Sequence, residues 1–283
     1  MIINWYIIDF HSHHEIEEFL KHLDFLFSKK DDTNIHIHIY NVWDDQKTST
    51  DHPKIYKNIK VKNFNGPNLG YFGSFFYMKS LEEISDHVSI SVFSNTDIEL
   101  EKFDIFRILN ENSSEFLLAP NILNSSGLDL NPHFKISPSK AKLIFYAYVF
   151  SLQITAIMYR FLAFCYRTFA PYIKDFLMPS IRKKGLKVPL QSSKKIYGLQ
   201  GSFILFKGDD KKLLKLLAYP LFLFNDELFL AKTANDLGIP TLHSDAVIVR
   251  HEGGMTTGKV LFRSKDIFQW FKDATSNGPN ISK

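Results

Sequence analysis

Residues 4–10 read "NWYIIDF", residues 14–28 read "HEIEEFLKHLDFLFS" and residues 34–40 read "NIHIHIY", and these three runs decide the fold. The first and third runs are short and apolar, with many β-branched and aromatic residues, which is typical of buried strands. The middle run is longer, and its apolar residues recur at the spacing of a helix. Strand, helix and strand in that order begin a parallel α/β sheet.

The same alternation continues along the chain. Residues 57–64, "KNIKVKNF", predict a strand, and residues 65–74, "NGPNLGYFGS", open a helix that runs through Leu81. A further strand, "HVSISVFS" at 87–94, ends at the sequence "NTDIEL". We therefore expect residues 1–136 to form an α/β half of the nucleotide-binding type.

Residues 137–190 form a different kind of segment, apolar and then basic. The uncharged run "LIFYAYVFSLQITAIMY" at 143–159 lies at the lower limit of length for a bilayer-spanning helix. Gln153, Arg160 and Arg167 fall seven residues apart and would form one polar stripe on a helix. That stripe favours a helix lying on a membrane or on the protein, and the basic run "IRKKGLK" that follows would attract anionic lipid. A buried helix with a solvated basic loop explains the same residues.

Residues 191–283 are expected to complete the sheet. "KKIYGLQGSFILFK" at 194–207 is a strand pattern interrupted by glycines, and "DAVIVRH" at 245–251 is a short strand. Between them, "NDELFLAKTANDLG" begins a helix with Asp226 and Glu227. Acidic residues are common in the first turn of a helix, because unpaired backbone N–H groups lie there. The same pair of carboxyl groups also suits a general base.

The composition indicates a globular protein with a mild positive charge. The chain has 283 residues, of which 45% are hydrophobic, and a formal net charge of +4. That charge suits an anionic ligand or a membrane surface and does not call for nucleic acid. The single cysteine, Cys165, excludes an internal disulfide and indicates a reducing compartment. The first residues lack a basic region and predict a buried strand instead of a signal peptide.

Histidines suggest one possible chemistry. The sequence "IIDFHSHHE" at 7–15 places His11 and His13 after an apolar strand, as in metal-dependent hydrolases of the amidohydrolase and PHP types. "IHIHIY" supplies a second His-x-His, and "LHSDA" a later histidine and aspartate. Against this alternative, the chain lacks the even succession of eight strand–helix pairs of a (β/α)₈ barrel.

A second candidate site lies where the strand at 87–94 ends. Ligands of α/β folds bind at the carboxyl ends of the strands, and Asp97 offers an oxygen ligand there to Mn²⁺ or Mg²⁺ on a diphosphate. Asn95 would contact the ribose or the ion through its amide. His251 ends the last predicted strand and would complete the set of metal ligands.

Six stretches, in this order, resemble the family 2 type of GT-A glycosyltransferases that build bacterial surface polysaccharides such as O-antigen and capsule. The resemblance extends over residues 5–260. It implies an α/β GT-A (Rossmann-like) fold with a central mixed, mostly parallel sheet flanked by helices, and a helical insertion near the membrane. The stretches are "IYNVWDD", "NLGYFGS", "SNTDIEL", "GLQGSFILFK", "NDELFLAKTANDLG" and "VRHEGG".

The resemblance also implies roles for individual residues. Glu227 would be the catalytic base, with Asp226 orienting it or binding the acceptor, and Asp97 and His251 would hold Mn²⁺ or Mg²⁺. Nearby cations such as Arg250 or Lys259 would offset charge on the leaving diphosphate. Gly201, Ser202 and Phe203 would contact the acceptor. The residues expected to bind the nucleotide sugar are Phe10, His11, Ser12, Asn41, Asp44, Asn68, Gly70, Gly73, Asn95 and Thr96.

The expected partners follow from the same resemblance. The donor would be a nucleotide-diphosphate sugar, with UDP the commonest base, and the acceptor a lipid-linked oligosaccharide or a growing polysaccharide. We expect a peripheral protein on the cytoplasmic face of the cell membrane, and a homo-oligomer is compatible with this. The three parts would be 1–136 for the donor, 137–190 as a helical insertion and 191–283 for the acceptor and base. Because Asn95 stands where the family has an acid, a non-catalytic paralogue that binds glycan or nucleotide is also an alternative.

Overall fold

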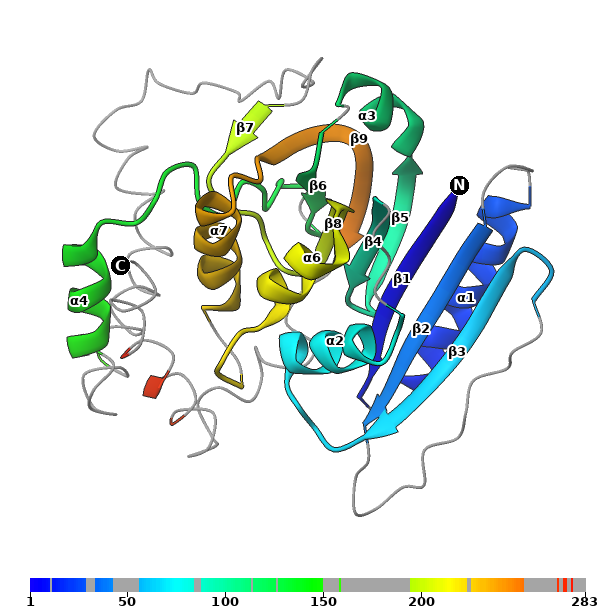
Figure 1. The fold of residues 1–283 in the computed structure, drawn as a ribbon, viewed down its shortest axis with the longest axis horizontal. Helices are drawn as coiled ribbons and strands as arrows, with labels where there is room; N and C mark the ends of the chain where they lie inside the picture. Colours follow the sequence, from blue (N-terminus) through cyan, green and yellow to red (C-terminus); the bar gives the residue numbers. More distant parts are fainter. Residues whose placement is uncertain are drawn as a thin grey trace.

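The structure of this chain is a computed structural model (Figure 1). It describes residues 1–10, 12–28, 34–42, 56–83, 88–112, 114–125, 127–149, 158, 194–222, 225–251, 269, 272, 273 and 276. The strands are β1 (Ile2–Asp9), β2 (Asn34–Val42), β3 (Ile59–Gly66), β4 (Ser89–Ser94), β5 (Ile98–Phe103), β6 (Phe116–Leu123), β7 (Lys194–Ile196), β8 (Phe203–Gly208) and β9 (Thr241–His251). The helices are α1 (His13–Phe27), α2 (Tyr71–Ser80), α3 (Ile105–Glu111), α4 (Lys140–Val149), α6 (Asp210–Leu217) and α7 (Asp226–Asp236).

The strands form one mixed sheet in the order β3-β2-β1-β4-β8-β6-β9-β5, with β7 paired to β9. β1 to β4 are mutually parallel, and β8 pairs antiparallel with both β4 and β6. β6 and β9 therefore run in the direction of β1, whereas β5, β7 and β8 run against it. The expected α/β fold, with a central mixed, mostly parallel sheet flanked by helices, is confirmed.

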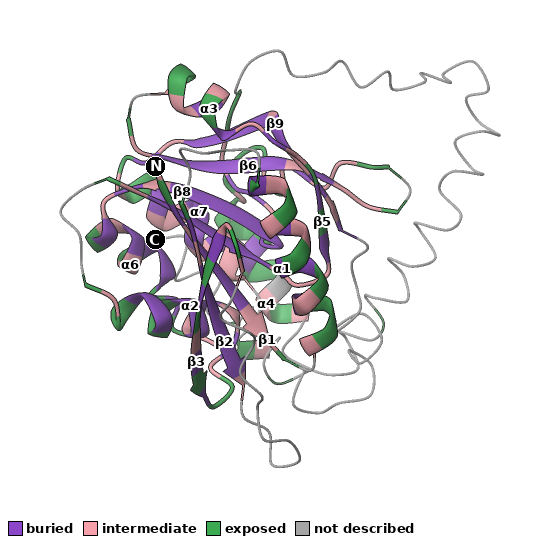
Figure 2. Ribbon diagram, turned by 90° about the vertical axis from the view of Figure 1, so that its right-hand side faces the viewer, coloured by how far each residue is buried: buried purple, intermediate pink, exposed green. Residues whose placement is uncertain are grey.

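Helices cover both faces of the sheet and bury two apolar layers, with the central strands buried between them (Figure 2). Successive side chains of β1 alternate between the layers, as strand geometry requires. Trp5 packs with α1, where its ring centroid lies 5.6 Å from that of Phe19. Tyr6 points to the opposite layer, which α2, α6 and α7 cover. α1 therefore lies on one face of the sheet, and α2, α6 and α7 lie on the other face.

Four elements carry no expectation from the sequence: α3, β5, β6 and α6. β6 is nearly all buried, and it lies between β8 and β9, so strands from both ends of the chain share one sheet. The boundaries expected at 136 and 190 stay predictions.

The expected apolar segment begins as α4, on which Ile144, Phe145 and Tyr148 are exposed. Gln153, Arg160, Arg167 and the basic run at 181–187 lie outside the described residues. Among the residues that are described, no helix is both long enough and apolar enough to cross a membrane.

A buried polar network attaches α2 to the sheet and to α6. Lys79 is 2% exposed, and its Nζ lies 3.1 Å from Glu82 Oε2 and 3.0 Å from Asp210 Oδ2. Glu82 also accepts a hydrogen bond of 2.8 Å from the Tyr6 hydroxyl and lies 2.8 Å from His38 Nδ1. Burial alone would raise the pKa of Glu82, but His38, Lys79 and Tyr6 together lower it to about 2. The network holds α2 in place through buried charges.

We predict that Lys79→Met destabilises the protein by about 3–5 kcal/mol, because it leaves two buried carboxylates without their cation. The measurement is the free energy of unfolding from urea denaturation. Lys215→Met is the matched control, since Lys215 is exposed on α6, and it should change stability by less than about 0.5 kcal/mol. Equal effects of the two substitutions would contradict a stabilising role for the network.

Candidate active site

The residues expected to bind a nucleotide sugar lie mostly at one edge of the sheet. Because β1 to β4 are parallel, their carboxyl ends meet there. Phe10 follows β1, Asn41 lies near the end of β2, Asn68 follows β3 and Asn95 follows β4. His11 and Asp44 lie outside the described residues. The topology thus brings together segments that are far apart in the sequence.

The ends of β1 and β2 offer mainly neutral polar groups. Phe10 is 41% exposed, and the backbone N–H of Ser12 donates to Asp9 Oδ1 at 3.0 Å before α1 begins. Asn41 is 1% exposed, and its amide donates to Asn65 Oδ1 at 3.0 Å. Asn41 is therefore held in a hydrogen-bonded cluster with β3.

The segment before α2 has a shape that depends on glycine. Asn68 Oδ1 accepts from the Gly70 N–H at 3.1 Å, and Gly70 has φ 75°, a left-handed conformation that favours glycine. A Cβ on Gly70 would lie 2.0 Å from the carbonyl oxygen of Phe222. Gly73 follows in the first turn of α2, where a Cβ would come within 3.2 Å of Leu69. The start of α2 therefore packs closely on the segment that precedes α7.

Asp97 and His251 lie side by side, because β5 and β9 pair with Ile98 opposite His251. Asp97 Oδ1 is 3.2 Å from His251 Nε2, and Asn95 Nδ2 is 3.4 Å from the same nitrogen. Burial acts to raise the pKa of Asp97, but His251 outweighs it and lowers the pKa. Thr96, which lies between Asn95 and Asp97 in the sequence, is partly buried. Within the described part of the chain, no group of three or more His, Cys, Asp or Glu residues is placed to hold a metal.

The turn before β8 lies next to this pair. β4 and β8 pair with Ser94 opposite Phe203, so the Asn95 N–H donates to the Ser202 carbonyl at 2.9 Å. Ser202 is 3% exposed and donates its N–H to Gln200 Oε1 at 2.8 Å. The Phe203 side chain is fully buried against Trp5, on the α1 face. Of the three expected acceptor residues, Phe203 thus offers only its backbone to this edge.

Asp226 and Glu227 begin α7 and lie against the same turn. Asn225 precedes them at φ 58°, a left-handed conformation that asparagine tolerates better than most residues. A Cβ on Gly201 would lie 3.2 Å from Glu227 Oε1. Burial, then the charge of Glu227 and a hydrogen bond to it, raises the pKa of Asp226 well above its ordinary value. Burial and the neighbouring negative charge thus both favour the protonated form of Asp226.

Three aromatic or imidazole side chains near this pair carry no expectation from the sequence. Burial and then the charges of Asp226, Glu227 and Asp97 raise the pKa of Tyr71, so all three carboxylates act on it electrostatically. Tyr219 has its pKa raised by burial and the charges of the same α7 pair. Burial lowers the pKa of His133, which the charge of Asp226 partly opposes. Of the three, only Tyr71 lies within a stretch that the sequence analysis singled out, "NLGYFGS", where it directly follows Gly70.

Of the two cations expected near the diphosphate, Arg250 is described, and it pairs with an acid on β5. Arg250 Nη2 pairs with Glu101 across the β5–β9 ladder. Since neighbouring residues of a strand point to opposite faces, Arg250 points away from the face that His251 uses. Lys259 lies outside the described residues.

The histidines expected for a hydrolase pair separately with acids. His13 Nδ1 lies 3.3 Å from Asp9 Oδ2, and His243 Nε2 lies 3.4 Å from Asp129 Oδ2. His38 lies beside Glu82 within the polar network, and His11 is outside the described residues. The described histidines therefore do not converge on one site.

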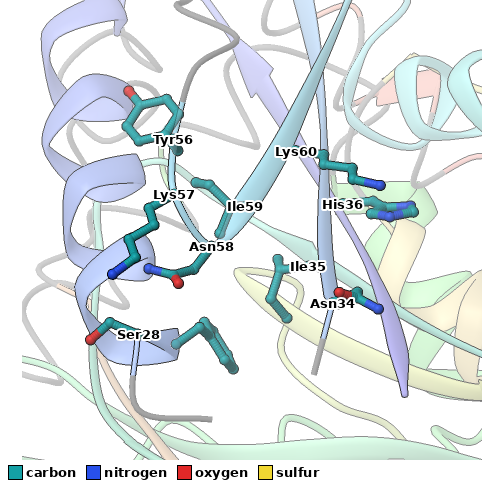
Figure 3. Close-up of a pocket in the computed structure, with 10 residues that line it drawn as sticks. Ser28, Asn34, Ile35, His36, Tyr56, Lys57, Asn58, Ile59 and Lys60 are labelled. Atoms are coloured by element: carbon teal, nitrogen blue, oxygen red, sulfur yellow. The ribbon is translucent and has the colours of Figure 1, made fainter. Parts of the chain in front are cut away.

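A pocket of about 310 Å³ lies at the opposite edge of the sheet (Figure 3). It is lined at the amino ends of β2 and β3 by residues that include His36, Lys57 and Lys60. At the rise of a strand, roughly 3.3 Å per residue, Asn34 is about 23 Å from Asn41. The pocket is thus separate from the carboxyl edge.

The comparisons with known proteins identify no family. No protein-family model and no curated protein matches the chain. Among solved structures, TarS from S. aureus has a TM-score of 0.47 at 11% identity, covering 89% of this chain and 37% of that one. TarS 1–349 in complex with UDP-GlcNAc has a TM-score of 0.48 at 12% identity, covering 91% and 61%. At these TM-scores, the likeness assigns neither a family nor an activity to this chain, which spans less than two thirds of either TarS chain.

We predict that Asp226→Asn makes the protein more stable than the wild type at neutral pH. A raised folded-state pKa gives stability that is present below the unfolded pKa and lost as pH rises through the folded pKa. The wild type should therefore lose stability from about pH 4 upward, and an uncharged amide should remove that loss. The measurement is the unfolding temperature of both proteins from pH 4 to 8.

Asp236→Asn is the matched control, at the other end of α7, where Asp236 forms a surface ion pair with Lys232. It should not show the same change with pH. A difference between Asp226→Asn and the wild type that is constant across the pH range would contradict the raised pKa.

Proposed function

We propose that this protein is an inverting glycosyltransferase that moves a sugar from a nucleotide-diphosphate donor to a hydroxyl group of an acceptor. The observation that carries the proposal is the turn at Gly201 and Ser202. One side of this turn accepts a hydrogen bond from Asn95, next to the Asp97–His251 pair, and the other side lies against Glu227. A group that suits a diphosphate and a group that suits a base therefore lie on two sides of one turn.

The chemistry assigns a role to each side. The acceptor oxygen attacks the anomeric carbon of the donor sugar, and the bond from that carbon to the diphosphate oxygen breaks. The hydroxyl proton passes to the Glu227 carboxylate, and the bonding electron pair leaves with the diphosphate. Because attack is in line with the leaving group, the configuration at the anomeric carbon inverts. Asp226, next to Glu227 in the first turn of α7, is proposed to orient the base.

Asp97 and His251 fit a divalent metal ion as two of its ligands. They offer one oxygen and one nitrogen at 3.2 Å from each other, and the other ligands would come from the donor. When bound, Mn²⁺ or Mg²⁺ would neutralise charge on the leaving diphosphate. Asn95, hydrogen-bonded to the Ser202 carbonyl, holds the acceptor turn next to these ligands.

The finer assignments of donor, acceptor and location belong to the same proposal. UDP is the first base to test, and Phe10, Asn41 and Asn68 are the described residues proposed to lie along the nucleotide. The acceptor is proposed to be lipid-linked, with the protein at the cytoplasmic face of the membrane. The exposed apolar residues Ile144 and Phe145 and the exposed Lys140 and Lys142 of α4 support a membrane surface as partner.

We predict that one diphosphate among UDP, GDP, CDP and dTDP stabilises the protein against thermal unfolding, and that Mn²⁺ increases the effect. A ligand at 100 times its Kd stabilises by about 2.7 kcal/mol. Asp97→Asn should lose the part that depends on Mn²⁺, whereas Glu99→Gln, two residues along, should retain it because Glu99 is exposed. Unchanged unfolding temperatures with all four diphosphates would exclude the proposed donor site. Stabilisation by a diphosphate without any turnover would favour the non-catalytic alternative.

We predict that Glu227→Gln lowers turnover by about 10²-fold or more, because it removes a positioned base. Diphosphate binding should change little, since the base acts on the acceptor. The measurement is release of the diphosphate from the matching nucleotide sugar, with a membrane lipid extract as the source of acceptor. Glu18→Gln, at an exposed position of α1, is the control. Full activity in Glu227→Gln would place the base elsewhere.

A further inference from the structure

The Tyr71 hydroxyl contacts the backbone of the acceptor turn. Tyr71 is the first residue of α2, and its hydroxyl donates to the Gly201 carbonyl oxygen at 2.9 Å. Its ring packs edge-on against Phe75, with 4.6 Å between ring centroids. The aromatic contact holds the side chain within α2, which leaves the hydroxyl to fix Gly201.

Gly201 in turn lies against the proposed base. A Cβ at Gly201 would lie 3.2 Å from Glu227 Oε1 and 3.4 Å from Glu227 Cγ, so the glycine and the carboxyl group are close to contact. A shift of the turn would open or close this space. The position of Gly201 therefore limits where the Glu227 carboxyl group can lie.

The start of α2 also contacts the segment that leads into α7. The close approach of Gly70 to the Phe222 carbonyl joins the two segments, and the Gly70 N–H donates to Asn68 Oδ1 just before α2 begins. The polar network around Lys79 fixes the other end of α2 to the sheet and to α6. Tyr71 thus projects from a helix that is held at both ends.

We propose that Tyr71 is a positioning residue, whose hydroxyl holds the Gly201 turn against Glu227 and so fixes the Glu227 carboxyl group in its place next to Asp226. This inference deepens the proposed function and rests on it for the role of Glu227 as the base. Tyr71 acts through Gly201 and forms no bond with the reacting atoms. The donor segment at Asn68–Gly70 and the base are thereby connected through one side chain.

Removal of the hydroxyl alone tests this role. Tyr71→Phe keeps the ring and its contact with Phe75 but frees the Gly201 carbonyl, so the turn can move and the Glu227 carboxyl group beside it can move away from Asp226. The groups that face the pair are Tyr71 from α2, Tyr219 after α6 and His133 after β6. Tyr219 and His133 are unchanged in the variant, so a weaker effect of Glu227 on the titration of Asp226 reports on Tyr71.

The first measurement needs no substrate. The unfolding temperature is recorded from pH 4 to 8 for the wild type, Tyr71→Phe and Tyr77→Phe, a control with a more exposed tyrosine on the same helix. We expect the loss of stability with rising pH to become smaller in Tyr71→Phe and to stay unchanged in Tyr77→Phe. A purely structural role would lower the unfolding temperature equally at every pH, and that result would overturn the proposal.

The second measurement separates turnover from binding. With the nucleotide sugar that matches the stabilising diphosphate, kcat should fall about tenfold or more in Tyr71→Phe, because small misplacements of a catalytic group are costly. The KM for the donor should stay unchanged. Gly201→Ala should also lower kcat, since its methyl group displaces Glu227. A kcat of Tyr71→Phe equal to that of the wild type would overturn the proposal.

The two measurements distinguish this proposal from the proposed function. If no diphosphate binds but the pH dependence changes in Tyr71→Phe alone, the glycosyltransferase assignment fails and the positioning of the carboxyl pair holds. If a diphosphate binds and the sugar is transferred while Tyr71→Phe behaves as the wild type in both measurements, the positioning role fails and the enzyme assignment holds.

Discussion

The turn at Gly201 and Ser202 is held from several directions, and the arrangement of the candidate site depends on it. Antiparallel pairing of β8 with β4 sets Ser202 beside Asn95, so that a backbone hydrogen bond of 2.9 Å joins the turn to the end of β4. The Gln200 N–H donates to Asn131 Oδ1 at 2.8 Å, and Tyr71 donates to the Gly201 carbonyl. A one-residue slip of β8 would send each of its side chains to the other face and move the turn away from the Asp97–His251 pair and from Glu227.

Electrostatics divides the site into two unlike pairs of groups. Asp97 has a partner that favours its charged form, and its pKa is lowered. Asp226 has a second carboxyl group as its neighbour, and burial together with the charge of that neighbour raises its pKa. Acids whose environments push their pKa values in opposite directions are typical of sites where one acid stays charged and another can keep its proton. The two pairs differ through their partners, since the acids themselves are chemically alike.

The two ends of α2 are held by different kinds of contact. Its amino end approaches α7 through a glycine, where backbone contacts leave no room for a side chain. Near its carboxyl end, Lys79 joins Glu82 and Asp210 within the protein. Such a buried ion pair contributes little net stability compared with apolar packing, but it allows few alternative positions. A rigid α2 is what the Tyr71 hydroxyl needs in order to hold a turn in a fixed place.

Much of this architecture follows from the order of residues alone. The strand–helix–strand periodicity of the first forty residues, the acids after β4 and at the start of α7, and the glycines before α2 all predict elements that the structure contains. Periodicity states which face of an element is buried, but it does not state which strands become neighbours. That β8 enters the sheet between β4 and β6, and that Ile98 lies opposite His251, are decided by long-range pairing, because many strand orders would bury the same apolar faces. The place of Tyr71 near three carboxylates depends on that pairing, and only the tertiary structure brings Gly201 between its hydroxyl and Glu227.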